Sequence, residues 1–206
     1  MQNRILLALL VFLSFTGCKT TPKLYSDVSE GQWRAKALIK DLAESRSYVV
    51  NLNINLVKNQ RARMDVTTGL GTGVASLVTD DKEVRYILVD KKRFYTGAAQ
   101  PSAMRPILSI PFDPRWLNNI LLEEPIVEKG WTCARDGSGF LSECHDSLSG
   151  LKVTWSDRHG DKKTVQLDHS KASVQIKVQS FKPKVEERKN LFTLEAPAGY
   201  QKLRVR

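Results

Sequence analysis

The sequence contains few of the groups on which catalysis depends. Its 206 residues include three histidines and three cysteines, and no serine is framed by glycines as in a hydrolase nucleophile. His145, His159 and His169 all lie on or beside expected turns. The dense acidic pairs, Glu123-Glu124 and Glu186-Glu187, fall on segments expected to be exposed. We therefore expect that this protein is not an enzyme and that it binds neither a metal ion nor a cofactor.

A nucleotide-binding loop is also missing. Residues 69–73 (GLGTG) are rich in glycine, but no lysine followed by serine or threonine ends the stretch. No helical pattern follows it either, and a phosphate-binding loop needs both features.

Long apolar runs are scarce, and the one that stands out opens the chain. Arg4 supplies a short positive region, and residues 5–15 (ILLALLVFLSF) are apolar or small. This run is too short for a membrane-spanning helix but is typical of a signal peptide. The small residues Thr16 and Gly17 then precede Cys18, as in the processing site of a bacterial lipoprotein. The alternative is an ordinary secretory signal that happens to contain a cysteine.

Processing at this site predicts a signal peptide (1–17), a lipidated tether (18–32) and one domain (33–206). Cys18 would carry a thioether-linked diacylglycerol and a further acyl chain such as palmitate. Each buried methylene contributes about 0.8 kcal/mol, so two or three chains anchor a protein firmly. Lys19, and not an aspartate, follows the cysteine, which favours the outer membrane over the inner one. We expect a lipid anchor in the outer membrane and a soluble domain facing the periplasm.

The chain is strongly basic. Its formal charge of +10 includes Arg4, so the mature protein carries 10 − 1 = +9. Export argues against nucleic acid as a partner. Anionic lipid or lipopolysaccharide surfaces are one explanation for the charge, and solvated faces of strands are the other.

Two cysteines remain once Cys18 is assigned to lipid. Cys133 and Cys144 flank a strong turn signal at residues 136–139 (DGSG). In an oxidising periplasm, a disulfide across this hairpin is the simplest use of both. Because His145 follows Cys144, two alternatives to the disulfide remain: the pair could bind a metal ion, or Cys144 could be a nucleophilic thiol.

Alternation of apolar and polar residues dominates the chain after residue 50. Apolar side chains recur at every second position in residues 52–56, 62–66, 151–155 and 174–178. Strands with one apolar face are typical of antiparallel sheets. Turn residues at 58–60, 79–82, 90–92 and 159–161 separate them closely enough for hairpins. Residues 33–41 fit either a helix or a strand, and their alternation favours a strand, so we expect roughly ten strands.

Residues 101–124 differ in character, with two helical pieces broken at Pro106 and Pro111. The second piece begins with Asp113 as N-cap and Pro114 at the first helical position. A sheet with one apolar face needs a cover, and these helices can supply it. The predicted fold is mainly β with some α: a half-open antiparallel β-barrel, or curved meander sheet, covered by short lid helices.

Short helices can cover only part of so broad an apolar surface, so we expect an apolar cavity suited to a lipid. Its expected lining comes from the apolar faces alone: Leu52, Ile54, Leu56, Met64, Val66, Leu77, Leu88, Ile107, Leu117, Leu121, Trp155, Val174 and Ile176. The four tryptophans could also serve as platforms for carbohydrate or lipid, although core packing is the expectation for at least three.

Three segments resemble the periplasmic lipoprotein-localisation family, LolA and LolB. Residues 66–72 (VTTGLGT) are similar to a strand and loop of LolB that reads LTNPLGS, and residues 94–125 are similar to the helical stretch that follows it. Residues 191–200 resemble the closing strand of LolA. With the Cys18 site, the resemblance spans most of residues 33–200. It is greatest to LolB, the lipid-anchored outer-membrane receptor.

The resemblance implies a half-open barrel that takes up the acyl chains of lipoproteins in transit, with a soluble LolA-like carrier as a further partner. Leu70 matches a leucine on a protruding LolB loop that inserts in the membrane, and Gly69 and Gly71 permit a tight loop there. The alternative is a leucine folded back onto the core. The sequence departs from the LolB pattern in three places. Thr68-Gly69 stands where LolB has asparagine-proline, and the helix before the first strand is shortened or missing. The hairpin with Cys133 and Cys144 has no counterpart in the pattern. These differences bear on the receptor role more than on the fold.

The leading interpretation is a monomeric outer-membrane lipoprotein that binds acyl chains in an apolar cavity. It would act as a chaperone in protein transport, accepting or inserting lipoproteins, or other lipid, at the outer membrane. The alternative is a lipid-anchored envelope module that holds a protein partner and carries no lipid.

Overall fold

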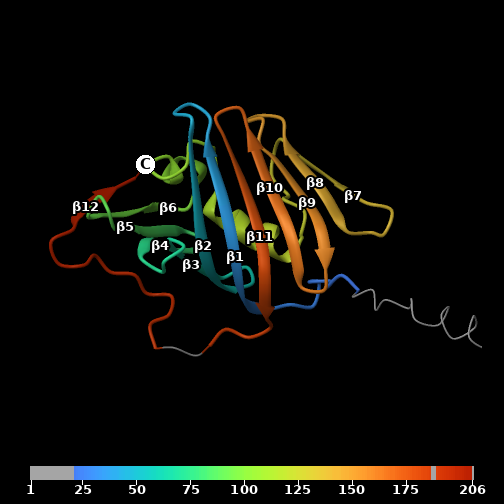
Figure 1. Ribbon diagram of the computed structural model, residues 1–206, viewed down its shortest axis with the longest axis horizontal. Coiled ribbons are helices and arrows are strands. Elements are labelled where there is room, and N and C mark those ends of the chain that lie inside the picture. Colours follow the sequence, from blue (N-terminus) through green and yellow to red (C-terminus); the bar gives the residue numbers. More distant parts are fainter. Residues whose placement is uncertain (1–20, 187–188, 206) are drawn as a thin grey trace, which may run out of the picture.

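The structure, a computed structural model, describes residues 21–186 and 189–205 (Figure 1). The expected signal peptide, Cys18 and Lys19 lie outside the described residues. The strands are β1 (Glu30–Asp41), β2 (Arg46–Val57), β3 (Arg61–Thr67), β4 (Gly73–Asp80), β5 (Glu83–Leu88), β6 (Arg93–Ala98), β7 (Trp131–Arg135), β8 (Leu141–Asp146), β9 (Lys152–His159), β10 (Lys162–His169), β11 (Ala172–Lys182) and β12 (Gln201–Arg204).

All twelve strands belong to one sheet, in the order β12-β6-β5-β4-β3-β2-β1-β11-β10-β9-β8-β7. Two hairpin meanders, β1 to β6 and β7 to β11, are joined by antiparallel pairing of β1 with β11. β12 adds to β6 in parallel. The expectation of a mainly β, largely antiparallel meander is confirmed, with twelve strands in place of ten. The sheet curves but does not close into a barrel, and β12 and β7 form its two edges.

The expected turns and the strand at residues 33–41 are present. The four predicted turn segments separate β2 from β3, β4 from β5, β5 from β6 and β9 from β10. Residues 33–41 form most of β1, which pairs along its length with β2. The predicted tether overlaps this fold, because β1 begins at Glu30 and Tyr25 is already buried.

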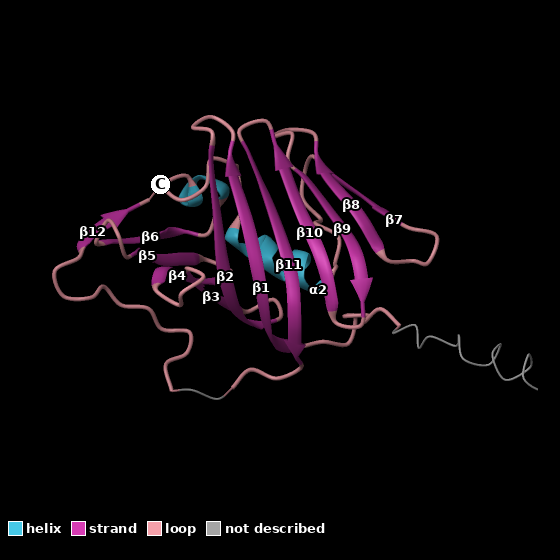
Figure 2. Cartoon of the chain, in the orientation of Figure 1, coloured by secondary structure: helices cyan, strands magenta, loops and turns pink. Residues whose placement is uncertain are grey.

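The helical segments lie on the concave side of the sheet (Figure 2). They are two 3₁₀ turns, η2 (Pro101–Met104) and η3 (Pro114–Trp116), and the helix α2 (Leu117–Leu122). The predicted start of the second piece is confirmed, since the Asp113 carboxylate accepts a hydrogen bond from the Arg115 backbone N–H at 2.9 Å. Both pieces are short, because Pro106 and Pro111 lie between them. None of the described helices is long and apolar enough to span a membrane.

The main core fills the space between the concave face and these helical segments. Side chains from every strand but β12 and β7 are buried there, together with Met104 of η2, Trp116 of η3 and three leucines of α2. Trp33, Trp116 and Trp155 are all at most 4% exposed. Trp131 packs edge-on against Trp116, with ring centroids 4.8 Å apart. The expectation that at least three tryptophans belong to the core is confirmed.

The strands β4, β5 and β6 are buried on both faces, which the alternation did not predict. Leu77, Tyr86 and Tyr95 face the main core, whereas their neighbours Val78, Ile87 and Phe94 face the outer side. There Leu194 covers them, with Phe192, Ala196 and Tyr200 around it. The C-terminal segment between β11 and β12 therefore acts as a second cover, on the outer face of these three strands.

Candidate functional site

The thirteen residues expected to line an acyl cavity all belong to one apolar layer. Ten of them are at most 9% exposed: Leu52, Ile54, Leu56, Leu77, Leu88, Leu117, Leu121, Trp155, Val174 and Ile176. Met64, Val66 and Ile107 are partly buried against the same cluster. Leu117 and Leu121 come from α2, and most of the others come from the concave face of the sheet. The structure thus gathers the predicted residues between sheet and lid, and the entry of an acyl chain among them stays a prediction.

The C-terminal end of α2 is fastened to the sheet by side chains of β9 and β10. A short helix leaves its last carbonyl groups without partners in the helix. The indole Nε1 of Trp155 donates to the Ile120 carbonyl at 2.9 Å. The Lys163 ammonium donates to the Leu121 carbonyl at 2.5 Å. Two consecutive carbonyls of the lid are therefore held by strand side chains.

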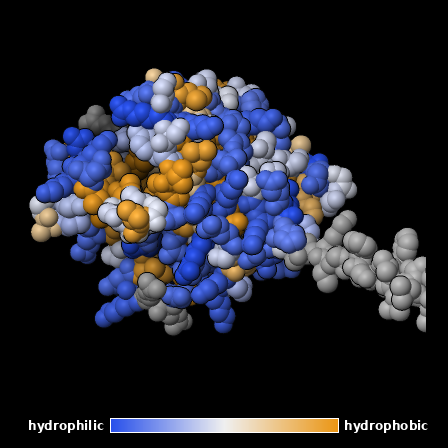
Figure 3. Space-filling model, in the orientation of Figure 1, coloured by the Kyte–Doolittle hydropathy of each residue, from blue (hydrophilic) through white to orange (hydrophobic). Residues whose placement is uncertain are grey.

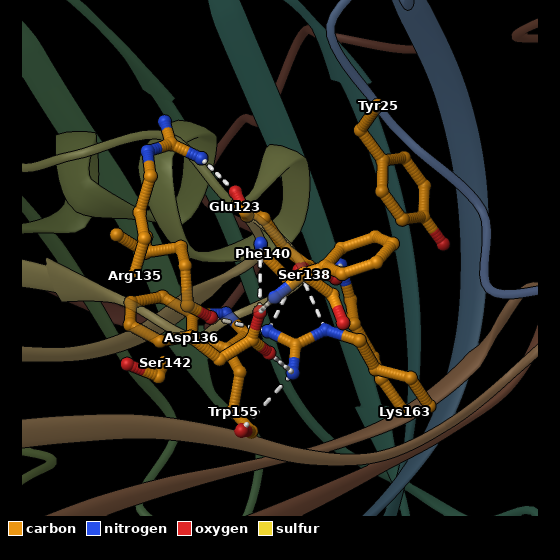
Figure 4. Close-up of polar contacts among 12 residues, drawn as sticks. Tyr25, Glu123, Arg135, Asp136, Ser138, Phe140, Ser142, Trp155 and Lys163 are labelled. Carbon is orange, nitrogen blue, oxygen red and sulfur yellow. Dashed lines mark hydrogen bonds and ion pairs between the residues drawn. The ribbon is translucent and has the colours of Figure 1, made fainter.

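Glu123 follows these carbonyls and ends the helix. Its backbone adopts the left-handed conformation, with φ of 54°. Its carboxylate binds Arg158 at 2.9 Å and Lys163, which is labelled with it in Figure 4, at 3.1 Å. Arg158 also donates to the carbonyls of Trp155 and Leu141. We call Glu123, Arg158 and Lys163 the latch.

The latch is an almost dry ion cluster. The side chains of Glu123, Arg158 and Lys163 are 7%, 11% and 1% exposed. Removing one member of a buried ion pair typically costs 3–5 kcal/mol, because the remaining charge is left without compensation. Burial lowers the pKa of Lys163 to about 8, and the neighbouring Glu123 carboxylate opposes this shift. Besides the apolar packing of α2, the end of the lid is thus held by buried charges, of which Arg158 also lies 4.0 Å from the Asp136 carboxylate.

The expected exposure of the Glu123-Glu124 pair is wrong for its first member. Glu124 forms a half-exposed ion pair with Lys58, but Glu123 turns inward at the left-handed residue that ends α2. A signal for Lys163 was present in the sequence. Lys163, like Val165 and Leu167, occupies every second position of β10. Alternate side chains of a strand share a face, so Lys163 lies on the apolar one.

Leu70 lies at the tip of the β3–β4 loop and is 97% exposed. The loop is closed by hydrogen bonds from the Thr68 N–H to the Thr72 carbonyl and from the Gly71 N–H to the Thr68 carbonyl, at 2.8 and 3.0 Å. Gly71 has φ of +86°, which favours glycine, whereas Gly69 needs no such freedom. The alternative of a leucine folded back onto the core is wrong.

Other apolar side chains are exposed at the same end of the sheet. Val49 on β2 and Val89 in the β5–β6 turn are 62% and 40% exposed. The Val89 N–H donates a hydrogen bond to the carbonyl of Val74, which comes just after the Leu70 loop, so Val89 lies beside that loop. Figure 3 shows apolar residues gathered on the side of the molecule where β2 to β5 lie, beside a largely hydrophilic surface over β1, β10 and β11.

Cys133 and Cys144 form a disulfide across the β7–β8 hairpin. The two residues are directly opposite in the register, with Cα atoms 4.1 Å apart. The predicted pairing is confirmed, so the alternative of a free nucleophilic thiol beside His145 is wrong. Among the described residues, no group of three or more histidine, cysteine, aspartate or glutamate side chains could hold a metal ion.

Two polar cavities lie on the outer side of the sheet, beneath the C-terminal segment, and the sequence did not indicate them. The smaller, of about 240 Å³, is bordered by Asn53, Asn55 and Arg63, and the larger, of about 680 Å³, by Arg61 and Phe192. Arg63 holds the segment in place by donating to the Leu191 carbonyl at 3.0 Å. Predicted lining residues of the acyl cavity border neither of them.

Comparison with solved structures relates this architecture to known proteins. A LolA superfamily protein from Nitrosomonas europaea superposes with a TM-score of 0.53 at 7% identity, covering 82% of this chain and 91% of that one. A domain assigned to outer-membrane lipoprotein sorting, from Vibrio parahaemolyticus, gives a TM-score of 0.54 at 10% identity, with the same coverage of both chains. The fold is LolA-like. No family model matches the sequence, and no curated protein matches it. The likeness supports the predicted resemblance at the level of the fold.

Proposed function

We propose that this protein is a lipid-anchored acceptor of acylated cargo at the outer membrane. Acyl chains of a lipoprotein, or of another lipid, would enter between the concave sheet and α2. The observation that carries the proposal is the cover of this face, whose regular elements are two 3₁₀ turns and one six-residue helix, packed on the sheet by buried apolar side chains and fastened by a few polar contacts. Releasing so small a lid exposes a continuous apolar surface without unfolding the sheet.

Transfer of this kind needs no chemical step. A ligand moves toward the site or membrane that binds it better, and the protein contributes only differential affinity. The proposed cargo acyl chains gain free energy when they leave water for an apolar layer. A soluble LolA-like carrier is the proposed donor, and the membrane is the final acceptor.

The Leu70 loop is proposed to contact the membrane during delivery. A fully exposed leucine on a closed loop keeps its apolar surface in water, which is unfavourable in free energy, and no contact in the folded protein compensates for it. Burying it in the interface of a bilayer recovers that cost, and the exposed Val49 and Val89 extend the same apolar surface. The expected anchor at Cys18 keeps the protein at the membrane, and the disulfide fits an oxidising envelope compartment.

A second function has one observation in its favour. The thirteen predicted cavity residues pack into a continuous core, as in a domain that holds no ligand. A lipid-anchored module that binds an envelope protein would need no more than this filled core. The outer face, with its two polar cavities, would then be the contact surface.

Lipid extraction separates the two proposals. The protein is purified from its own membranes after cleavage within the tether, so that the anchor lipid is removed, and bound lipid is measured by mass spectrometry. A carrier is expected to retain acylated molecules and to bind a fluorescent fatty-acyl probe that competes with them. A domain that retains no lipid and takes up no probe contradicts the carrier proposal and favours the interaction module.

A further inference from the structure

The segment before β1 is docked onto the domain. The Lys23 N–H donates to the Gly160 carbonyl at 2.8 Å, in the turn between β9 and β10. The Tyr25 hydroxyl donates to the Asp161 carbonyl at 3.2 Å. Tyr25 itself is only 3% exposed. Residues that composition assigned to a tether therefore form part of the folded structure.

The ring of Tyr25 covers the latch. The Lys163 ammonium lies over this ring, 3.9 Å from its centroid (Figure 4). Phe181 packs edge-on against Tyr25 with ring centroids 5.3 Å apart, and the centroid of Trp33 lies 6.3 Å away. A cation held over an aromatic face in a dry site is stabilised more strongly than one in water. Tyr25 thus both shields the ammonium and attracts it.

Lys163 joins this segment to the lid. The same ammonium donates to the Leu121 carbonyl of α2 and binds the Glu123 carboxylate. Contacts therefore run without interruption from the N-terminal segment, through Tyr25 and Lys163, to the last turn of the lid helix. The segment and the lid are separated by about 100 residues of sequence, yet one side chain contacts both.

The expected anchor is close to this junction in the sequence. Residues 19–22 separate Cys18 from Lys23 in the sequence, so the Cα atoms of these two residues can be at most about 18 Å apart. A pull by the membrane on Cys18 would therefore act on Lys23 and Tyr25. This step rests on the proposed function, since it takes the lipid anchor as given.

We propose that the segment Lys23–Tyr25 is a brace that keeps the lid closed. While Tyr25 is docked, Lys163 stays dry and holds Leu121 and Glu123. When the segment is drawn away, water reaches the ammonium, and its bonds to the lid weaken because screening by water weakens every charge contact. Strain on the membrane anchor would then loosen α2 and open the acyl-binding face.

Hydrogen exchange of α2 tests the brace in the full-length protein, without any ligand. Tyr25→Ala is expected to raise exchange of peptides covering residues 113–126 by roughly tenfold. Tyr25→Phe keeps the ring over Lys163 and removes only the hydroxyl group, with its bond to Asp161, so its α2 exchange should stay near that of the native protein. Leu24→Ala, at an exposed neighbouring residue, is the matched control.

The outcomes are distinct. Faster exchange confined to α2 and the β9–β10 turn in Tyr25→Ala supports the brace. Unchanged α2 exchange in that variant overturns it, and so does an equal rise in β2 and β11, which would mean global destabilisation. If Tyr25→Ala does not fold, Tyr25→Leu keeps the burial and removes the cation–π contact, and the same comparison applies. Faster α2 exchange in Tyr25→Ala, without uptake of an acyl probe, would support the brace but contradict the proposal that the protein carries acyl chains.

Discussion

Leu70 is the residue at which sequence and structure agree most directly on an unusual feature. Its exposure follows from local chemistry, because Gly71 supplies the left-handed conformation and Thr68 closes the loop with both backbone groups. The Thr68 carbonyl also accepts from the Asn51 side chain at 3.1 Å, which fixes the loop against β2. The leucine is therefore presented on a firm support, as a membrane-contacting side chain needs to be.

Leu70→Glu tests this role. The charge cannot enter the apolar part of a bilayer at low cost, so we expect weaker binding to vesicles and slower delivery of acyl probe. Folding should be unaffected, because the native side chain makes no contribution to the core. The matched control is Val127→Glu, which places the same charge at a valine that is 90% exposed elsewhere. Equal transfer by the two variants would remove the loop from the mechanism.

The lid is the element whose stability depends most on a few contacts. Glu123 and Glu124 are neighbours in sequence with different surroundings, which gives a matched pair of variants. Glu123→Gln leaves buried Lys163 without a carboxylate and Arg158 with only the more distant Asp136, and we expect a loss of about 3 kcal/mol in the free energy of unfolding. Glu124→Gln removes a half-exposed pair with Lys58 and should cost less than about 1 kcal/mol.

Urea denaturation followed by tryptophan fluorescence measures both losses, since Trp155 bonds to the lid. Glu123→Gln should also take up a fatty-acyl probe faster than Glu124→Gln, because only the first change loosens the end of α2. Equal losses in the two variants would contradict the latch. Faster uptake by Glu124→Gln would do so as well.

The strands, their turns and the start of the second helical piece could be predicted because each depends on nearby residues. Local signals include the alternation of apolar and polar residues, which indicates strands at 52–56 and 174–178. Another is Asp113 before Pro114, which indicates the start of a helix. The latch could not be predicted in this way. Glu123 and Lys163 are 40 residues apart, and their meeting depends on the register of β10 and the place where α2 ends.

The outer cover was missed for a related reason. The run of apolar residues in β5 indicates burial on both faces, but nothing local shows what buries the second one. Leu194 and Phe192 reach it only because the C-terminal segment crosses the outer face before β12 joins β6. The resemblance to a known family pointed to the helical stretch and to Leu70, whose role at the membrane stays a prediction, and it gave no indication of Tyr25.

At the scale of the whole molecule, the latch makes stability depend on pH. The groups that face the Lys163 ammonium are the Glu123 carboxylate from the lid, Arg158 from β9 and the ring of Tyr25. Burial lowers the pKa of Lys163 from 10.5 to about 8, so the folded protein releases this proton at lower pH than the unfolded chain does. Between pH 8 and 10.5 the unfolded chain binds more protons, and the free energy of unfolding therefore rises with pH.

Lys163→Met isolates this contribution, because methionine fills similar space and does not titrate. We expect the stability of the native protein relative to Lys163→Met to increase between pH 8 and 9.5, by on the order of 1–2 kcal/mol, and to be constant below pH 7. The raised pKa of buried Tyr25 acts in the opposite direction, since the folded state then keeps its proton longer, but only above pH 10. Urea titrations at half-unit steps of pH would measure the difference. A difference that falls or stays level from pH 8 to 9.5 would contradict this prediction, because it would mean that the contacts with Glu123 and Tyr25 offset or outweigh the effect of burial on the pKa of Lys163.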